Sequence, residues 1–268
     1  MIKIDDILYH QYMDVFCSLF STYSFDILKS SASKKTICIY SSDFPLNYPF
    51  DNGCDYYYTC NTDNNNWITT LMDFLEYCYY SILNCTILHG SCVKINGNGI
   101  LMLGGRRSGK STLTYHLINQ NNALYLDDDA IFLYNNSLIG FNSPIRMRNK
   151  CTDNSMLLEK SIDIDNELHY VYNIENDRKI SKITKPSCII FPKYNTDIDF
   201  QIAELSGYAL INQILSNVKE SANLLTTYKD ISSYFSNIQA YVLQYNNCDR
   251  VSCFLYKIKC KNSERDSE

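Results

Sequence analysis

Gly104-Gly105-Arg106-Arg107-Ser108-Gly109-Lys110-Ser111-Thr112 is the stretch that decides the fold of this chain. It matches the pattern G-x-x-x-x-G-K-[ST], a glycine-rich loop that holds phosphate. The glycines let the backbone turn tightly and direct several N–H groups to one point, and the following helix presents its positive N-terminal end to the same point. Lys110 would supply a cation to the β- and γ-phosphates, and Ser111 a hydroxyl ligand to Mg²⁺.

The residues on either side of this loop have the strand–loop–helix order that the motif requires. Residues 99–103 form a short apolar run that ends at the loop, which is typical of a buried strand. After the loop, Leu113, Leu117 and Ile118 recur at helical spacing. This context favours true nucleotide binding over a fortuitous glycine turn, so we predict that residues 104–112 bind ATP.

A hairpin precedes the loop. Asn96-Gly97-Asn98-Gly99 separates apolar runs at 91–95 and 100–103, and Asn-Gly is a strong hairpin signal. The strand before the loop therefore has an antiparallel neighbour, unlike the commonest P-loop proteins, and this disfavours a generic P-loop ATPase. The other predicted elements are strands at 36–40, 86–88, 123–126, 187–191 and 198–200, a hairpin over 131–141, and helices over 67–82 and after Glu204.

Three acidic residues, Asp127, Asp128 and Asp129, follow the strand predicted over 123–126. Mg²⁺ prefers oxygen ligands, and a hydroxyl that receives a phosphoryl group needs a proton acceptor. Adjacent carboxylates repel each other, so at least one should bind metal or have a raised pKa. An acidic turn capping a strand is the structural alternative, but the position shortly after the P-loop helix favours a metal and base site.

Three further residues have a functional and a structural interpretation. His89 precedes the hairpin that leads into the loop, so it lies either near the γ-phosphate or in a purely structural position. Arg146 and Arg148 occupy alternate positions of an extended segment and so share one face. They would hold a phosphate or an acceptor carboxylate, or else form a solvated strand edge.

Composition restricts the class of partner. The chain has 268 residues, 46% of them hydrophobic, and a net charge of −5, with no basic stripe interleaved with aromatics, so we expect no nucleic-acid partner. No apolar run is long enough for a membrane span, and the N-terminus lacks a signal-peptide pattern. The twelve cysteines include no C-x-x-C pair and no histidine at metal-ligand spacing, which predicts a cytoplasmic protein with mostly free, buried thiols.

The chain divides into three parts on these patterns. Residues 1–62 form a small N-terminal α+β region of unknown role, in which Ile7, Tyr12 and Leu19 belong to an amphipathic pattern. Residues 63–260 form the P-loop domain, and residues 261–268 form a polar tail. A helical stripe that includes Leu71, Leu75 and Cys78 is interpreted as core.

The order and spacing of these motifs resemble those of the HPr kinase/phosphorylase-like serine kinases. The resemblance is good over residues 84–148 and loose from there to about residue 245. It rests on Leu88-His89-Gly90, the Asn-Gly hairpin, the P-loop, the acidic triplet, and Gly140-Phe141 through Arg146. It implies a P-loop core of the HPr kinase and phosphoenolpyruvate carboxykinase type with a mixed sheet. It also implies ATP and Mg²⁺ as cofactors, and an aspartate pair, either Asp127 and Asp128 or Asp128 and Asp129, as base and metal contact.

Two departures mark the chain as a divergent relative. Thr112 stands where HPr kinases have an acidic residue, and only Leu158-Glu159-Lys160 resembles their downstream signature. The leading hypothesis is an ATP-dependent kinase that phosphorylates a hydroxyl, most simply serine, of a peptide or small protein such as a ribosomal natural-product precursor. The alternatives are a non-catalytic ATP-binding sensor or adaptor and a kinase of the HPr phosphocarrier protein. The oligomeric state stays open, with a homo-oligomer among the options because related kinases often assemble.

Overall fold

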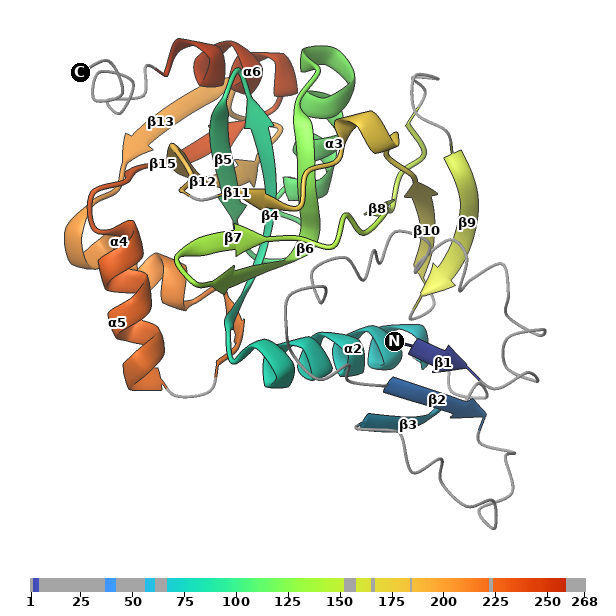
Figure 1. Ribbon diagram of the computed structural model, residues 1–268. Coiled ribbons are helices and arrows are strands. Elements are labelled where there is room, and N and C mark those ends of the chain that lie inside the picture. Colours follow the sequence, from blue (N-terminus) through green and yellow to red (C-terminus); the bar gives the residue numbers. More distant parts are fainter. Residues whose placement is uncertain are drawn as a thin grey trace.

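The computed structural model describes residues 2–4, 37–41, 56–60, 67–151, 158–164, 167–183, 185–221 and 224–258. Its centre is a nine-stranded mixed sheet (Figure 1). In spatial order the strands are β11 (Lys182–Ile183), β7 (Ser137–Ile139), β6 (Leu124–Tyr134), β4 (Thr86–Ile95), β5 (Asn98–Leu103), β12 (Cys188–Tyr194), β15 (Gln239–Tyr245) and β13 (Phe200–Glu204), and β14 (Val218–Glu220) pairs with β4. The fold is therefore of the mixed α/β class.

The predicted hairpin before the P-loop is confirmed. β4 and β5 pair antiparallel, with Ile95 opposite Asn98, and Asn96 and Gly97 both have positive φ, 48° and 85°. Two successive positive φ angles are the requirement of the tight turn that matches strand twist. On its other side β5 pairs in parallel with β12. One strand thus has an antiparallel and a parallel neighbour, of which the sequence predicted the antiparallel one.

The boundaries predicted around the acidic triplet are wrong in one respect. We predicted that a strand ends before Asp127, yet β6 continues through the triplet to Tyr134, and β4 is likewise one strand from 86 to 95. Cys92, Ser91 and Gly90 of β4 lie opposite the three aspartates in order. Because β4 supplies backbone partners along the whole stretch, pairing overrides the low strand propensity of aspartate.

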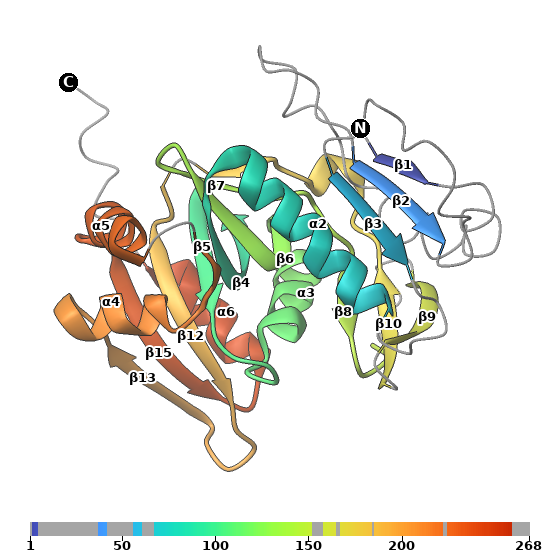
Figure 2. The same ribbon diagram turned by 90° about the horizontal axis from the view of Figure 1, so that it is seen from below.

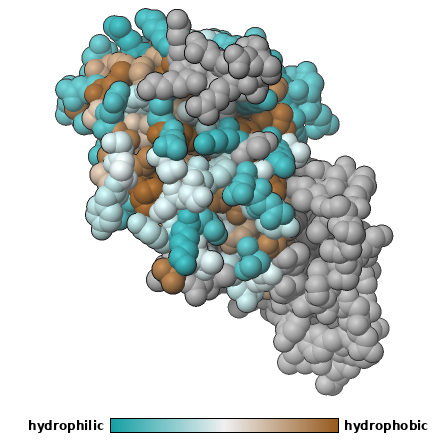
Figure 3. Space-filling view, turned by 60° about the vertical axis from the view of Figure 1, so that its left-hand side comes forward, coloured by the Kyte–Doolittle hydropathy of each residue, from teal (hydrophilic) through white to brown (hydrophobic). Residues whose placement is uncertain are grey.

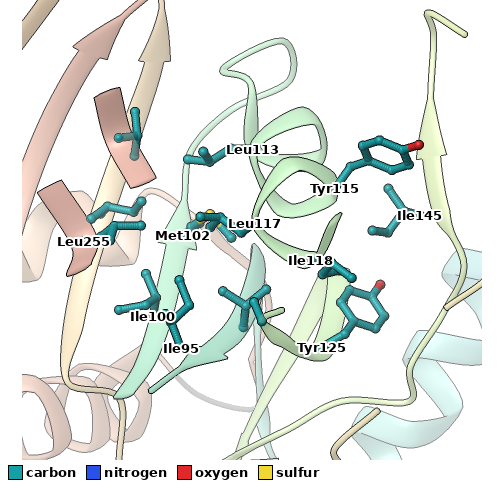
Figure 4. Packing of buried hydrophobic residues seen from close by; sticks show 14 of the residues in the cluster. Ile95, Ile100, Met102, Leu113, Tyr115, Leu117, Ile118, Tyr125, Ile145 and Leu255 are labelled. Atoms are coloured by element: carbon teal, nitrogen blue, oxygen red, sulfur yellow. The ribbon is translucent and has the colours of Figure 1, made fainter. Parts of the chain in front are cut away.

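Helices cover both faces of the sheet. The P-loop helix α3 (Lys110–Asn121) and α6 (Cys248–Lys257) pack on one face, and α4 (Gly207–Leu215) and α5 (Leu224–Phe235) pack on the other. Alternate residues of β5 divide between the two cores: Ile100 and Met102 join α3 and α6 (Figure 4), and Leu101 and Leu103 join α4 and α5. Packing on both sides fixes β5, and with it the start of the loop that follows.

The remaining elements surround one end of this sheet. Helix α2 (Trp67–Leu83) lies between the central sheet and a small parallel sheet, as Figure 2 shows. Leu71, Leu75 and Cys78 of α2 are buried, as predicted. The small parallel sheet is formed by β1 (Ile2–Ile4), β2 (Ile37–Ser41) and β3 (Tyr56–Cys60). A third sheet is formed by β8 (Ile145–Met147), β10 (Glu167–Tyr172) and β9 (Leu158–Ile164). A short 3₁₀ helix, η2, spans Asn176–Arg178.

Other predictions have mixed outcomes. The helix with Leu210, Ile211 and Ile214 buried is confirmed as α4, and Cys78, Cys85 and Cys92 are buried free thiols. The amphipathic pattern from Ile7 and the polar tail lie outside the described residues. Among the helices that the structure describes, none is long and apolar enough to cross a membrane. Hydrophilic and hydrophobic residues are intermixed on the face drawn in Figure 3.

Candidate functional site

The P-loop connects β5 to α3 through a backbone that depends on glycine. Arg107 has a φ of 65° and Gly109, which caps the N-terminus of α3, a φ of 95°. A Cβ at position 109 would lie 2.5 Å from the Tyr245 hydroxyl, which is hydrogen-bonded to the Gly109 carbonyl at 3.3 Å. Both the conformation and the space therefore require glycine at this position.

The side chain of Lys110 is buried and points back toward the start of the loop. Its Nζ donates to the carbonyl oxygens of Gly104, at 2.6 Å, and Gly105, at 3.0 Å. Burial lowers the pKa of Lys110, while the charges of Asp128 and Asp129 raise it. The arrangement keeps the cation at the centre of the loop, beside the N-terminal end of α3.

Asp127 is occupied by backbone groups. Its carboxylate accepts hydrogen bonds from the N–H groups of Phe141 at 2.5 Å, Ser143 at 3.1 Å and Asp128 at 2.9 Å. Burial raises the pKa of Asp127 to about 7, although these N–H groups oppose the rise. The contacts tie the segment after β7 to β6, so this carboxylate has a structural task.

Asp128 is the carboxylate that faces the P-loop. It interacts with the hydroxyl of Ser111 and with the charge of Lys110, and both lower its pKa. Its Oδ1 is buried and has no hydrogen-bond partner among the described residues. Burial raises the pKa of Asp128 to about 6, and the neighbouring charge of Asp129 adds to the rise, whereas Ser111 and Lys110 oppose it.

Asp129 contacts basic side chains from three other elements. Its Oδ1 lies 3.1 Å from His89 Nε2, and its Oδ2 lies 3.0 Å from Arg146 Nη2 and 3.6 Å from Lys219 Nζ. Burial by itself would raise the pKa of Asp129, but His89, Arg146 and Lys219 together hold it far below its usual range. Its φ of 80° marks the point where this side chain leaves the regular path of β6.

Two further residues, Lys219 and Glu76, extend these contacts and belong to no sequence motif. Lys219 on β14 contacts both carboxylate oxygens of Glu76 on α2, at 2.9 and 3.2 Å. Glu76 is buried, and burial raises its pKa although Lys219 opposes the rise. Only a charged position within the buried face of α2 hinted at Glu76, and nothing around Lys219 distinguished it in the sequence.

The arginines predicted to share one ligand contact different acids. Arg146 binds Asp129, whereas Arg148 is hydrogen-bonded to Glu167 on β10. Glu167 also pairs with Arg107 of the P-loop, with Arg107 Nη2 at 3.2 Å from its Oε1. The structure thus brings Arg146 to the acidic cluster and places Arg148 at the outer side of the loop.

The other loop residues differ in exposure. Arg106 and Thr112 are exposed, and Ser108 is half-buried, with an Oγ that has no hydrogen-bond partner among the described residues. Thr112 lies in the first turn of α3, as the motif predicts. An unpaired hydroxyl inside a phosphate-binding loop suits a site that is completed by a ligand.

The side chains present fit a magnesium ion that arrives with a nucleotide. Within the described ranges, no group of three or more His, Cys, Asp or Glu side chains is placed to hold a metal alone. Mg²⁺ in such sites takes one or two protein oxygens and completes its shell with phosphate oxygens and water. The Ser111 hydroxyl and the Asp128 carboxylate supply that number of protein ligands.

Comparison with known proteins gives little beyond this geometry. No protein-family model matches the chain, and no curated protein sequence matches it. Among solved structures, it is similar to the Hpr(Ser) kinase/phosphatase from Coxiella burnetii, at 15% sequence identity, with a TM-score of 0.30, over 63% of this chain and 90% of that chain. A TM-score this low does not indicate a function.

Proposed function

We propose that the protein is an ATP-dependent kinase that transfers the γ-phosphoryl group to a hydroxyl, most simply the serine of a peptide or small protein. The proposal rests on one observation: the Asp128 carboxylate interacts with both Ser111 and Lys110 of the P-loop. A P-loop alone binds phosphate, but a buried carboxylate facing the loop adds the acid–base and metal chemistry that transfer needs.

The proposed roles follow from the contacts. Lys110 and the N–H groups at the start of α3 bind the β- and γ-phosphates, once the lysine exchanges the Gly104 and Gly105 carbonyls for phosphate oxygens. Ser111 and Asp128 would hold Mg²⁺, which when bound neutralises phosphate charge. Arg146 pairs with Asp129, and its own side chain is 18% exposed. It would stabilise negative charge on the phosphoryl oxygens.

Asp128 is also the best-placed proton acceptor in the proposed mechanism. Its Oδ1 has no hydrogen-bond partner among the described residues, so this oxygen would accept the hydroxyl proton while the other carboxylate oxygen holds the metal. Asp127 is left out of the chemistry because backbone N–H groups occupy its carboxylate. His89 is assigned a positioning role, since it contacts Asp129 rather than Lys110.

The test separates binding from transfer. Lys110→Ala is expected to weaken ATP binding in calorimetry, and Asp128→Asn to keep ATP binding but lower transfer by about 10²–10⁴-fold. Transfer is measured with labelled ATP, Mg²⁺ and a mixture of serine-containing peptides, together with ADP release. Lys229→Ala, at an exposed lysine of α5, is the matched control.

Two outcomes would count against the proposal. Near-full transfer by either site variant would remove the assigned roles. Tight ATP binding by the wild type with no ADP release and no labelled acceptor would favour the sensor or adaptor alternative. Preferential labelling of an added HPr phosphocarrier protein over the peptide mixture would identify the acceptor as HPr and keep the kinase proposal.

A further inference from the structure

A lysine outside every motif lies in the cluster around Asp129. β14 pairs antiparallel with β4, with Val218 opposite Leu88, and the His89 N–H donates to the Asn217 carbonyl at 2.7 Å. These contacts fix Lys219 beside His89. Its ammonium lies 2.9 Å from Glu76 and 3.6 Å from Asp129.

Stability alone does not account for this arrangement. Glu76 is 8% exposed and the side chain of Lys219 is 24% exposed, so both charges have lost much of their hydration. A buried ion pair commonly contributes no more to stability than a well-packed apolar pair. A desolvated charge cluster next to a phosphate-binding loop is instead a common feature of functional sites.

Carboxylates around Lys219 keep it a cation. Burial lowers the pKa of Lys219, but the charges of Asp129, Glu76 and Asp73 raise it above its usual value. Burial lowers the pKa of Lys110, the charges of Asp128 and Asp129 raise it, and the like charge of Lys219 lowers it. Arg146 joins them on Asp129. Three cations, from α3, β8 and β14, therefore interact with the same carboxylate next to the P-loop, and a multiply charged phosphate would contact them together.

Lys219 also has capacity for such a ligand. An ammonium group has three N–H donors, and the Glu76 carboxylate accepts through its two oxygens. The separation of 3.6 Å from Asp129 is an ion pair but too long for a good hydrogen bond. One N–H can therefore turn to a phosphate oxygen without loss of the Glu76 contacts.

We propose that Lys219 is a second lysine of the phosphate site, which binds the terminal phosphate of the nucleotide opposite Lys110 and is held ready by Glu76. The inference rests on the proposed function and names a residue of the same site. Its specific consequence is discrimination between ATP and ADP, because only ATP presents the phosphate that Lys219 would contact.

The experiment is calorimetric titration of the full chain with ATP and with ADP, each in the presence of Mg²⁺. Lys219→Met is expected to raise the Kd for ATP about tenfold or more, as for loss of a charge-assisted hydrogen bond, and to change the Kd for ADP less than about twofold. Lys219→Arg should recover part of the affinity for ATP. Lys229→Met on α5 is the matched control, and melting curves verify folding.

A second variant excludes a purely structural effect. Lys219→Met leaves Glu76 buried without its cation, so the double variant Glu76→Gln/Lys219→Met removes that charge and should fold. Weak ATP binding by the double variant supports the inference, and recovery of wild-type ATP binding overturns it. Equal loss of ATP and ADP binding, or no loss, also overturns it. If Lys110→Ala weakens ATP binding while Lys219→Met does not, only this inference fails, whereas unchanged binding by Lys110→Ala rejects the proposed function.

Discussion

Asp127 and Asp128 are adjacent and both buried, yet their carboxylates meet different atoms. Successive residues of a strand point to opposite faces, so neighbours on β6 have different surroundings. Asp127 meets backbone N–H groups of Phe141 and Ser143, and Asp128 meets Ser111 and the charge of Lys110. Surroundings, rather than residue type, therefore separate a structural carboxylate from the one suited to chemistry.

This difference predicts that Asp128→Asn stabilises the metal-free protein. Burial raises the pKa of Asp128 from 3.8 to about 6. Folding stability from an acid with a raised pKa is lost as pH rises from the ordinary value through the folded value, so the full penalty is present at pH 8 and absent near pH 4. Its upper bound is on the order of 3 kcal/mol. Urea unfolding in EDTA should show a gain for Asp128→Asn at pH 8 that disappears at low pH.

The matched control is the neighbouring carboxylate. Asp127→Ala leaves three backbone N–H groups without their acceptor, and each unsatisfied buried group costs about 1–3 kcal/mol. Burial also raises the pKa of Asp127, to about 7, so the two variants are compared near pH 4, where neither carboxylate carries its charge penalty. There Asp127→Ala should lower the free energy of unfolding, whereas Asp128→Asn should leave it nearly unchanged. A similar loss for both variants would contradict the division of roles between the two aspartates.

The sequence could identify the acidic triplet, but it could not assign different roles to the three aspartates. The P-loop pattern is local, and a short window of residues determines its geometry. The partners of the aspartates come from elsewhere: Phe141 from the segment after β7, Arg146 from β8 and Lys219 from β14. No spacing rule connects those positions, so the sequence left the alternatives open among Asp127, Asp128 and Asp129.

At the scale of elements, the register of three strands assembles the site. β4 lies between β5 and β6, and Gly90 is opposite Leu103 on one side and Asp129 on the other. The Asn96-Gly97 turn fixes the β4–β5 register locally and was predictable. The continuation of β6 through the triplet and the pairing of β14 depend on long-range contacts, which the sequence pattern does not encode.

The variant Gly90→Ala tests how closely β4 and β5 approach each other. A Cβ at position 90 would lie 2.6 Å from the Met102 carbonyl oxygen, which is backbone and cannot rotate away. We expect a loss of about 1–3 kcal/mol in the free energy of unfolding, as for overpacking in a core. Gly105→Ala is the control, because a Cβ there meets nothing within 4 Å. Equal melting temperatures for wild type and Gly90→Ala would contradict the close approach of β4 and β5.

At the scale of the whole molecule, the charge cluster connects parts that are distant in sequence. Glu76 of α2, His89 of β4, Asp129 of β6, Arg146 of β8 and Lys219 of β14 form one continuous set of ion pairs. Helix α2 therefore contributes to the same site as the P-loop.

Because these elements meet at one site, ligand binding should stabilise the whole fold. A ligand that binds only the folded state at 100 times its Kd adds about 2.7 kcal/mol, or about 5–10 °C in melting temperature for a domain of this size. ATP with Mg²⁺ should give this shift, and EDTA should reduce it. Ser111→Ala should lose the part that depends on Mg²⁺, because the hydroxyl beside Asp128 is gone. Ser233→Ala, at an exposed serine of α5, should melt like the wild type with and without Mg²⁺. An equal Mg²⁺-dependent shift for Ser111→Ala would place the metal away from Ser111 and Asp128.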